Sequence, residues 1–186
     1  MTTRSLLVTR DPVWLPNRRG IRQQLPKAVQ SWTYETGSLT QRLRRAYGSA
    51  VKVSLLHLQW QTPFLSEQQR LQLPARRYAL VREVLLHADG QPLILARTVI
   101  PASTIAFAHS NLAKLGTRPL GEVIFAYPKL ARLQLDVALV QPVLWTPATC
   151  ALAAVAAPVW GRRTVYGLQH QHLLVSEFFL PGSLAV

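Results

Sequence analysis

The sequence contains one cysteine, few acidic residues and no long apolar run, and each shortage excludes a class of protein. A lone cysteine, Cys150, rules out an intramolecular disulfide, so nothing indicates a secreted, disulfide-stabilised domain. No apolar run reaches the roughly 18 residues needed to cross a bilayer. The apolar stretch in the opening MTTRSLLVTRDP is too short for a signal peptide. We therefore expect a soluble, cytoplasmic protein with no membrane span.

Acidic residues are scarce: 8 Asp and Glu stand against 21 Lys and Arg, which gives a formal net charge of +13. A field of this sign attracts anions, whether nucleic acids, acidic membrane surfaces or anionic metabolites. The arginine pairs are dispersed along the chain, and zinc-finger spacing and RNA-binding aromatic motifs are missing. We therefore expect most arginines on a solvated surface, with no specific nucleic-acid partner. Because acidic residues are so few, one that lies inside an apolar stretch is a candidate for a specific role.

The motifs of phosphate loops and of serine hydrolases are missing too, since the chain has no glycine-rich phosphate loop and no G-x-S-x-G elbow. His170 and His172 have the spacing of two metal ligands on one strand face. No third ligand accompanies them, so we interpret them as polar turn residues. Cys150 has no catalytic partner in the sequence and is expected in the core. The sequence therefore predicts no metal site.

The chain is 49% apolar, which is enough to fold residues 1–186 as one domain. Six stretches have the composition or the alternation of strands: 51–60, 78–87, 93–100, 130–140, 160–168 and 173–180. Asp89-Gly90, between the second and third stretches, is a strong hairpin signal. Consecutive strands joined by short connections predict an α+β domain around a single six-stranded antiparallel sheet.

Short helices are expected to flank this sheet, at 26–34, 39–46, 110–116 and 117–125. The second has the clearest ends, because Ser38 with Gln41 forms a capping-box pattern and Gly48 fits a C-terminal stop. Other segments have no such pattern, namely an N-terminal arm at 1–25 that we expect to be partly ordered, a polar connection at 66–76 and an Ala/Pro-rich insert at 141–158.

Two of the expected helices begin at Leu39 and Leu120, and their first turns offer backbone donors. The first N–H groups of a helix lack partners within the helix and carry partial positive charge. A ligand carboxylate placed there finds ready donors. Every helix has such an end, so this pattern is weak on its own.

Glu177 lies in the middle of LLVSEFFLP, an otherwise apolar stretch in which an unpaired carboxylate is costly. Arg82 has a similar setting, because alternation puts it on one strand face with Leu80 and Val84. Two interpretations fit equally well. Either Arg82 forms a buried ion pair with Glu177 or extends to the surface, or the two residues mark a site in which Arg82 binds a substrate carboxylate.

Arg97 lies on the strand next to that of Arg82, with Leu95 and Val99 on the same face. As a candidate substrate-binding residue it adds a second positive charge to the same pocket. The other interpretation, which we favour from the sequence alone, is that Arg97 sits at the edge of the sheet.

Several stretches in a fixed order resemble the chorismate lyase family over residues 78–181: VREVLLHADGQP, ARTVIP, LAKLGTRPLG, VWGRRT and LLVSEFFLP. GSLTQRL, at 37–43, resembles it more weakly. The resemblance implies an enzyme without a metal or organic cofactor that converts chorismate to pyruvate and 4-hydroxybenzoate, a precursor of ubiquinone. We expect a monomer.

The resemblance also implies a fold and a site. The fold is a six-stranded antiparallel sheet whose flanking helices enclose a ligand pocket. In the site, Arg82 corresponds to the residue that binds the aromatic carboxylate, and the backbones of Leu39 and Leu120 add further contacts. Glu177 corresponds to the residue near the product hydroxyl, so that Arg82 and Glu177 are the candidate catalytic residues.

The alternative is a non-catalytic, small-molecule effector-binding domain of the related transcription-regulator fold. A complete regulator needs a DNA-binding helix-turn-helix, and the basic first 50 residues are the only place for one. Pro12, Pro16 and Pro26 interrupt that segment, and it has no convincing pair of amphipathic helices. We therefore prefer the enzyme.

Overall fold

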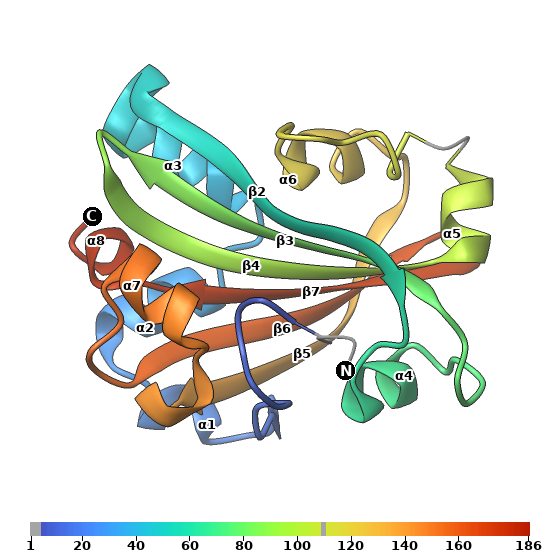
Figure 1. Cartoon of the computed structure of the whole chain (residues 1–186), viewed down its shortest axis with the longest axis horizontal. Helices are drawn as coiled ribbons and strands as arrows, with labels where there is room; N and C mark the ends of the chain where they lie inside the picture. Colours follow the sequence, from blue (N-terminus) through green and yellow to red (C-terminus); the bar gives the residue numbers. More distant parts are fainter. Residues whose placement is uncertain (1–4, 109–110) are drawn as a thin grey trace.

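Antiparallel strands form one sheet in the computed structural model, which describes residues 5–108 and 111–186 (Figure 1). In spatial order they are β1 (Leu15–Pro16), β5 (Leu130–Val140), β6 (Val159–Leu168), β7 (Gln171–Phe179), β4 (Gln91–Pro101), β3 (Ala79–Ala88) and β2 (Val51–Gln61). The predicted α+β class, with one antiparallel sheet and flanking helices, is confirmed.

The sheet has seven strands rather than the predicted six. The six long strands, β2 to β7, coincide with the six predicted stretches. The additional strand, β1, consists of two residues that pair with Val137 and Asp136 at the edge of the sheet. A pairing this short leaves no alternation in the sequence, so the pattern of residues 1–25 does not reveal it.

The hairpin between β3 and β4 turns where the sequence predicts. Asp89 has φ 47° and Gly90 has φ 80°, so both central residues are in the left-handed region that a type I′ turn requires. The pairing register then shifts by one residue between Leu86 and His87. Such a bulge reverses the faces on which the following residues of β4 lie relative to β3.

The helices are short: α1 (Ile21–Gln24), α2 (Lys27–Thr33), α3 (Leu39–Tyr47), α4 (Leu65–Arg70), α5 (Ala102–Phe107), α6 (Leu120–Ile124), α7 (Pro147–Ala153) and α8 (Pro181–Leu184), with 3₁₀ turns η1 (Gly48–Ala50) and η2 (Pro142–Leu144). The predictions of α2 and α3 are confirmed. Ser38 caps α3 by accepting a hydrogen bond from the Gln41 backbone, and Gly48 is its C-cap. These ends were readable because local chemistry determines them.

Other helix predictions need correction. Residues 111–114 form turns instead of the helix predicted at 110–116, and Ser110 lies outside the described residues. The helix of this region is α5, and α4 occupies much of the predicted polar connection. The residues at their N-caps are Phe64 and Pro101, whose side chains give none of the usual hydroxyl or carboxylate cap signals. α6 is present but shorter than predicted, with Pro119 at its N-cap.

Helices cover both faces of the sheet. α3 and α6 lie over one face, and α4 and the N-terminal segment lie over the other (Figure 1). In the N-terminal segment, Ser5 Oγ and the Leu6 N–H both donate to the buried Glu83 carboxylate, at 2.5 and 2.7 Å. None of the described helices has the length and apolar character needed to cross a bilayer.

Candidate functional site

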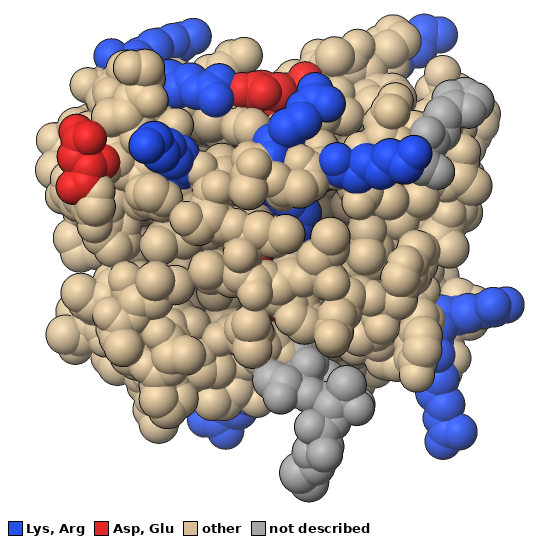
Figure 2. Space-filling view, turned by 45° about the horizontal axis from the view of Figure 1, so that its top comes forward, with Lys and Arg blue, Asp and Glu red and all other residues tan. Residues whose placement is uncertain are grey.

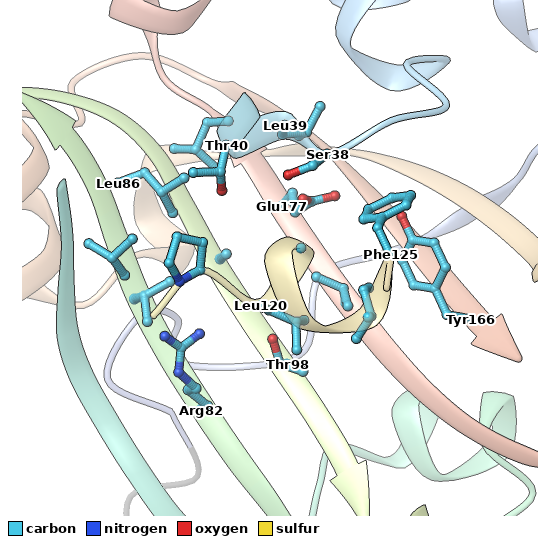
Figure 3. A pocket seen from close by; sticks show the side chains of 18 of the residues that line it. Ser38, Leu39, Thr40, Arg82, Leu86, Thr98, Leu120, Phe125, Tyr166 and Glu177 are labelled. Atoms are coloured by element: carbon cyan, nitrogen blue, oxygen red, sulfur yellow. The ribbon is translucent and has the colours of Figure 1, made fainter. Parts of the chain in front are cut away.

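A cavity lies between the sheet and the two helices on its α3–α6 side. Strands β3, β4, β6 and β7 supply its floor, and residues 37–40 and 119–121, at the starts of α3 and α6, lie over it. Arg82 and Glu177 both line this cavity, and Figure 3 shows them well separated, with Glu177 near Ser38. The structure thus brings the two candidate catalytic residues to one cavity without direct contact.

The pairing register explains this arrangement. Arg82 on β3 pairs with Thr98 on β4, and both line the cavity. Glu177 on β7 pairs with Ala96 on β4 and with Arg162 on β6. Because side chains on one face recur every second residue, the two polar groups belong to neighbouring rows of that face.

Arg82 is a buried cation with 2% of its surface exposed. Its Nη2 donates to the carbonyls of Gly116 and Arg118, both at 2.9 Å, and its Nε to that of Gly116 at 3.3 Å. Among the described residues, Nη1 has no hydrogen-bond partner and no carboxylate forms an ion pair with Arg82. Burial therefore lowers the pKa of Arg82 from its ordinary value to about 10.

Glu177 has a different partner. Its Oε2 accepts a hydrogen bond of 2.7 Å from Nε of Arg162, and its side chain keeps 15% of its surface exposed. Burial is the largest single effect and lowers the pKa of Arg162, but the charge and hydrogen bond of Glu177, together with the smaller effects of Tyr166 and Glu35, exceed it, so the pKa of Arg162 is raised. The predicted ion pair between Arg82 and Glu177 is therefore wrong, because Glu177 pairs with Arg162 instead.

Leu39 and Leu120 are the first residues of α3 and α6, and both line the cavity. The two helix starts are close together, because a Cβ built on Gly121 would lie 2.4 Å from Ser38 Oγ. Their free backbone donors therefore meet at the same side of the cavity.

Arg97 is on the other face of the sheet and is absent from the cavity lining. It forms buried ion pairs with Glu67, at 2.7 Å, and Glu83, at 2.7 Å. The interpretation that Arg97 sits at the edge is wrong, since β4 lies between β3 and β7. The placement also gives no support to Arg97 as a charge in the same pocket as Arg82.

Sequence reasoning missed Arg162, Ser38, Tyr166 and Phe125, all of which line the cavity. Alternation along 160–168 already puts Arg162 and Tyr166 on one face, so that signal was present. Tyr166 packs edge-on against Phe125, with ring centroids 6.1 Å apart, and forms an aromatic wall (Figure 3). The flat apolar surface of this wall suits packing against the six-membered ring of a ligand.

The polar groups of the cavity define what it can recognise. Arg82 offers a cation for an anionic group, and Glu177 offers an acceptor for a hydroxyl. Within residues 5–108 and 111–186, no three His, Cys, Asp or Glu side chains gather as metal ligands. His170 lies in a turn as predicted, whereas His172 lies on β7, so the turn interpretation is wrong for His172. The residues present therefore fit a small carboxylate that also carries a hydroxyl and a ring.

The family model and the relatives found by sequence agree on one family. The family described as chorismate lyase matches residues 10–184. A probable chorismate pyruvate-lyase of Methylococcus capsulatus is 44% identical over 158 residues, covering 85% of this chain and 98% of the relative. The chorismate pyruvate-lyase of Pectobacterium atrosepticum is 31% identical over 159 residues, covering 86% of this chain and 80% of the relative.

Solved structures share the fold at low identity. The effector domain of PhnF from Mycobacterium smegmatis has a TM-score of 0.57 and 19% identity, covering 80% of this chain and 91% of that domain. A second structure, of PhnF from the same organism, has a TM-score of 0.58 and 19% identity, with 81% of this chain and 66% of that chain covered. At this identity the likeness describes the fold alone.

Proposed function

The chain belongs to the chorismate lyase family, and from this premise we propose how its cavity converts chorismate to pyruvate and 4-hydroxybenzoate. The protein is a chorismate pyruvate-lyase. The observation that carries the assignment of the site is Arg82, a buried guanidinium that lines the cavity and has no carboxylate partner among the described residues. A buried cation of this kind favours an anionic ligand.

Arg82 binds the ring carboxylate in this proposal. Nε and Nη2 already donate to carbonyls of residues 116–118, so Nη1 is the group that meets the ligand. The backbone N–H groups that begin α3 and α6, at Leu39 and Leu120, supply further donors. The carboxylate is thereby held at one end of the cavity.

Glu177 accepts the hydrogen bond of the C4 hydroxyl at the other end. With both ends held, the ring lies along the floor and the enolpyruvyl side chain is confined in a reactive conformer. The C3–O bond then breaks, the C4 hydrogen leaves, and the released enolpyruvyl group gains one hydrogen at its methylene carbon to become pyruvate. The driving force is formation of the aromatic ring.

The test is an assay of purified protein with chorismate and no added metal or cofactor. We expect equimolar pyruvate and 4-hydroxybenzoate. Replacing Arg82 by Ala should weaken 4-hydroxybenzoate binding by about 2–5 kcal/mol, because a desolvated charge pair loses one partner. As a control, Arg163→Ala removes a buried arginine on the opposite face and should keep product affinity.

Folded protein that releases no pyruvate would overturn the activity. Equal product affinity in the wild type and in Arg82→Ala would instead remove Arg82 from the site. Binding of 4-hydroxybenzoate without turnover is the result expected of an effector-binding domain. We further propose that residues 1–186 act as a single-domain, cytoplasmic monomer, which sedimentation and cell fractionation test.

A further inference from the structure

Arg162 is buried in the middle of the sheet, with 1% of its surface exposed, and its contacts extend in two directions. We propose that Arg162 is the positioning residue of the site: it orients Glu177 towards the ligand hydroxyl and fixes the loop that lies over the cavity. This inference rests on the proposed function, in which Glu177 accepts that hydroxyl.

The first direction is towards Glu177. Nε of Arg162 donates to Oε2 at 2.7 Å, which leaves Oε1 without a hydrogen-bond partner among the described residues. Because Glu177 is partly exposed and lines the cavity, this remaining oxygen is available to a ligand donor. A carboxylate oxygen held in this way faces the cavity as a hydrogen-bond acceptor.

The second direction is towards residues 34–38, which we call the α2–α3 loop. Nη1 of Arg162 donates to the carbonyls of Trp32, Thr33 and Glu35, at 3.1, 3.2 and 2.9 Å. Nη2 of Arg132 donates to the same Glu35 carbonyl at 2.7 Å. Carbonyls at the end of a helix lack partners within the helix. Arg162 satisfies those of Trp32 and Thr33, and the two arginines together hold the Glu35 carbonyl of the loop.

The α2–α3 loop ends at Ser38, the cap of α3, which lies over the cavity. One guanidinium therefore connects the hydroxyl acceptor on the floor with the start of the helix above it. A change at Arg162 displaces both. Its effect should be largest at the hydroxyl end of the ligand, because Arg82 and the start of α6, neither of which is hydrogen-bonded to Arg162, still hold the carboxylate.

Arg163 provides a matched comparison. It is the next residue on β6, is equally buried, and pairs with Asp136 at 2.7 Å on the opposite face. Asp136 is also buried and receives Nη2 of Arg70, so this pair belongs to the interior of that face. Loss of Arg163 is therefore expected to lower stability without altering recognition of the hydroxyl.

The experiment compares two ligands that differ only in the hydroxyl, 4-hydroxybenzoate and benzoate. Their dissociation constants are measured by calorimetry for the wild type, Arg162→Gln, Arg162→Lys, Arg163→Gln and Glu177→Gln. We expect the wild type to prefer 4-hydroxybenzoate, and Arg162→Gln to reduce this preference about tenfold or more, since a charged hydrogen bond is weakened. Arg162→Lys should recover part of it, and Arg163→Gln should retain it.

The Glu177→Gln variant shows whether Arg162 acts through Glu177. Adding Arg162→Gln to Glu177→Gln should reduce the preference little further, because the group that Arg162 orients is already altered. An Arg162→Gln variant that weakens both ligands equally would overturn the inference, since that is the result of a purely structural role. Should this variant not fold, the same ratio measured in Arg162→Lys decides.

Failure of the inference differs from failure of the proposed function. A wild type that turns chorismate over but binds both ligands equally keeps the activity and removes the role of Glu177 and Arg162. A wild type that prefers 4-hydroxybenzoate but releases no pyruvate keeps the site and removes the activity.

Discussion

Buried arginines of this sheet differ in what compensates their charge. Arg97 has two carboxylate partners on the far face, and Arg162 has Glu177. Arg82 contacts backbone carbonyls, which offer partial charges only. A carboxylate ligand in the cavity would offset the unfavourable burial of the Arg82 charge. A neutral ligand would not, so the site favours anions.

This difference predicts a pH dependence for ligand binding. The pKa of Arg82 is lowered to about 10 in the free protein, and the carboxylate ligand binds the protonated form. Below this pKa, benzoate affinity should be constant. As pH rises through about 10, binding must recover a proton, so affinity falls and approaches a tenfold loss per pH unit. Calorimetric titrations from about pH 8 to pH 11 measure it, with circular dichroism to verify the fold.

Benzamide is the matched control, because it has the shape of benzoate without the charge. Its affinity should not follow the titration of Arg82. A benzoate affinity that stays constant to about pH 11 in folded protein would contradict a carboxylate site that depends on an Arg82 with a lowered pKa.

Predictions for single residues succeed where the pattern within one strand decides the position, and fail where pairing between strands decides it. Alternation selected Arg82, and the apolar stretch around Glu177 selected that residue; both line the cavity. Arg97 failed because a two-residue turn without a bulge would pair it with Arg82, whereas the register shift after Leu86 pairs Arg82 with Thr98. One extra residue moves Arg97 to the opposite face.

Arg162 was missed because the turn between β6 and β7 is shorter than the sequence predicts. The polar turn was predicted as the four residues 169–172, but Leu168 pairs with Gln171, so the turn has two residues. Only this shorter turn brings Arg162 opposite Glu177. Pairing across strands depends on turn length, which composition does not determine.

At the scale of elements, the cavity depends on how closely α3 and α6 approach each other. Gly121 permits the approach, because a Cβ there would lie 2.4 Å from Ser38 Oγ and 3.1 Å from Ser38 Cβ. Gly121→Ala should therefore displace the cap of α3, lower the free energy of unfolding by about 1 kcal/mol, and reduce kcat/KM by about 10- to 100-fold through misplaced helix starts. Thermal unfolding and initial-rate assays measure both effects.

Two variants make this prediction specific. Gly37→Ala meets only Glu35 Oε1 at 3.4 Å, an ordinary contact, and should behave like the wild type. Ser38→Ala removes the clashing oxygen, so adding it to Gly121→Ala should recover part of the activity. A Gly121→Ala enzyme with wild-type kcat/KM would show that the distance between the helices does not control the site.

Element boundaries were predictable where side chains determine them locally. α3 has its signals at Ser38, Gln41 and Gly48, and it forms where predicted. α4 and α5 are each six residues long and begin after Phe64 and Pro101. Helices this short are stabilised by packing on the sheet, so propensity and periodicity carry too little information to find them.

For the whole molecule, ion pairs inside the fold use several of the few acidic residues. The exposed charged side chains of the described residues are therefore nearly all positive. Three of the acids, Glu67, Glu83 and Asp136, are buried, and Asp89 is the only acid classed as exposed in the described residues. The exposed cations are Arg10, Arg18, Arg19, Arg22, Lys27, Arg44, Arg45, Lys52, Arg76, Arg77, Lys114, Arg118 and Lys129. Figure 2 shows basic side chains distributed over one face with few acidic ones.

A dispersed charge of this kind predicts weak, non-selective binding of nucleic acid. The cations come from many elements, and α1 and α2, of 4 and 7 residues, are too short to form a helix-turn-helix near the N-terminus. Affinity for duplex DNA should therefore be independent of sequence. If a contact neutralises about four phosphates, raising salt from about 50 to 200 mM should weaken binding roughly a hundredfold.

Fluorescence anisotropy with labelled duplexes of unrelated sequence measures this, with and without saturating 4-hydroxybenzoate. The ligand occupies an interior cavity and leaves the exposed cations unchanged, so it should not alter DNA affinity. A regulator behaves differently, because its effector and its DNA site are coupled and each changes the affinity for the other. Tight, sequence-selective DNA binding that responds to 4-hydroxybenzoate would therefore favour the regulator. Salt-sensitive DNA binding that does not change with the ligand would instead support a positive surface whose field attracts the anionic substrate.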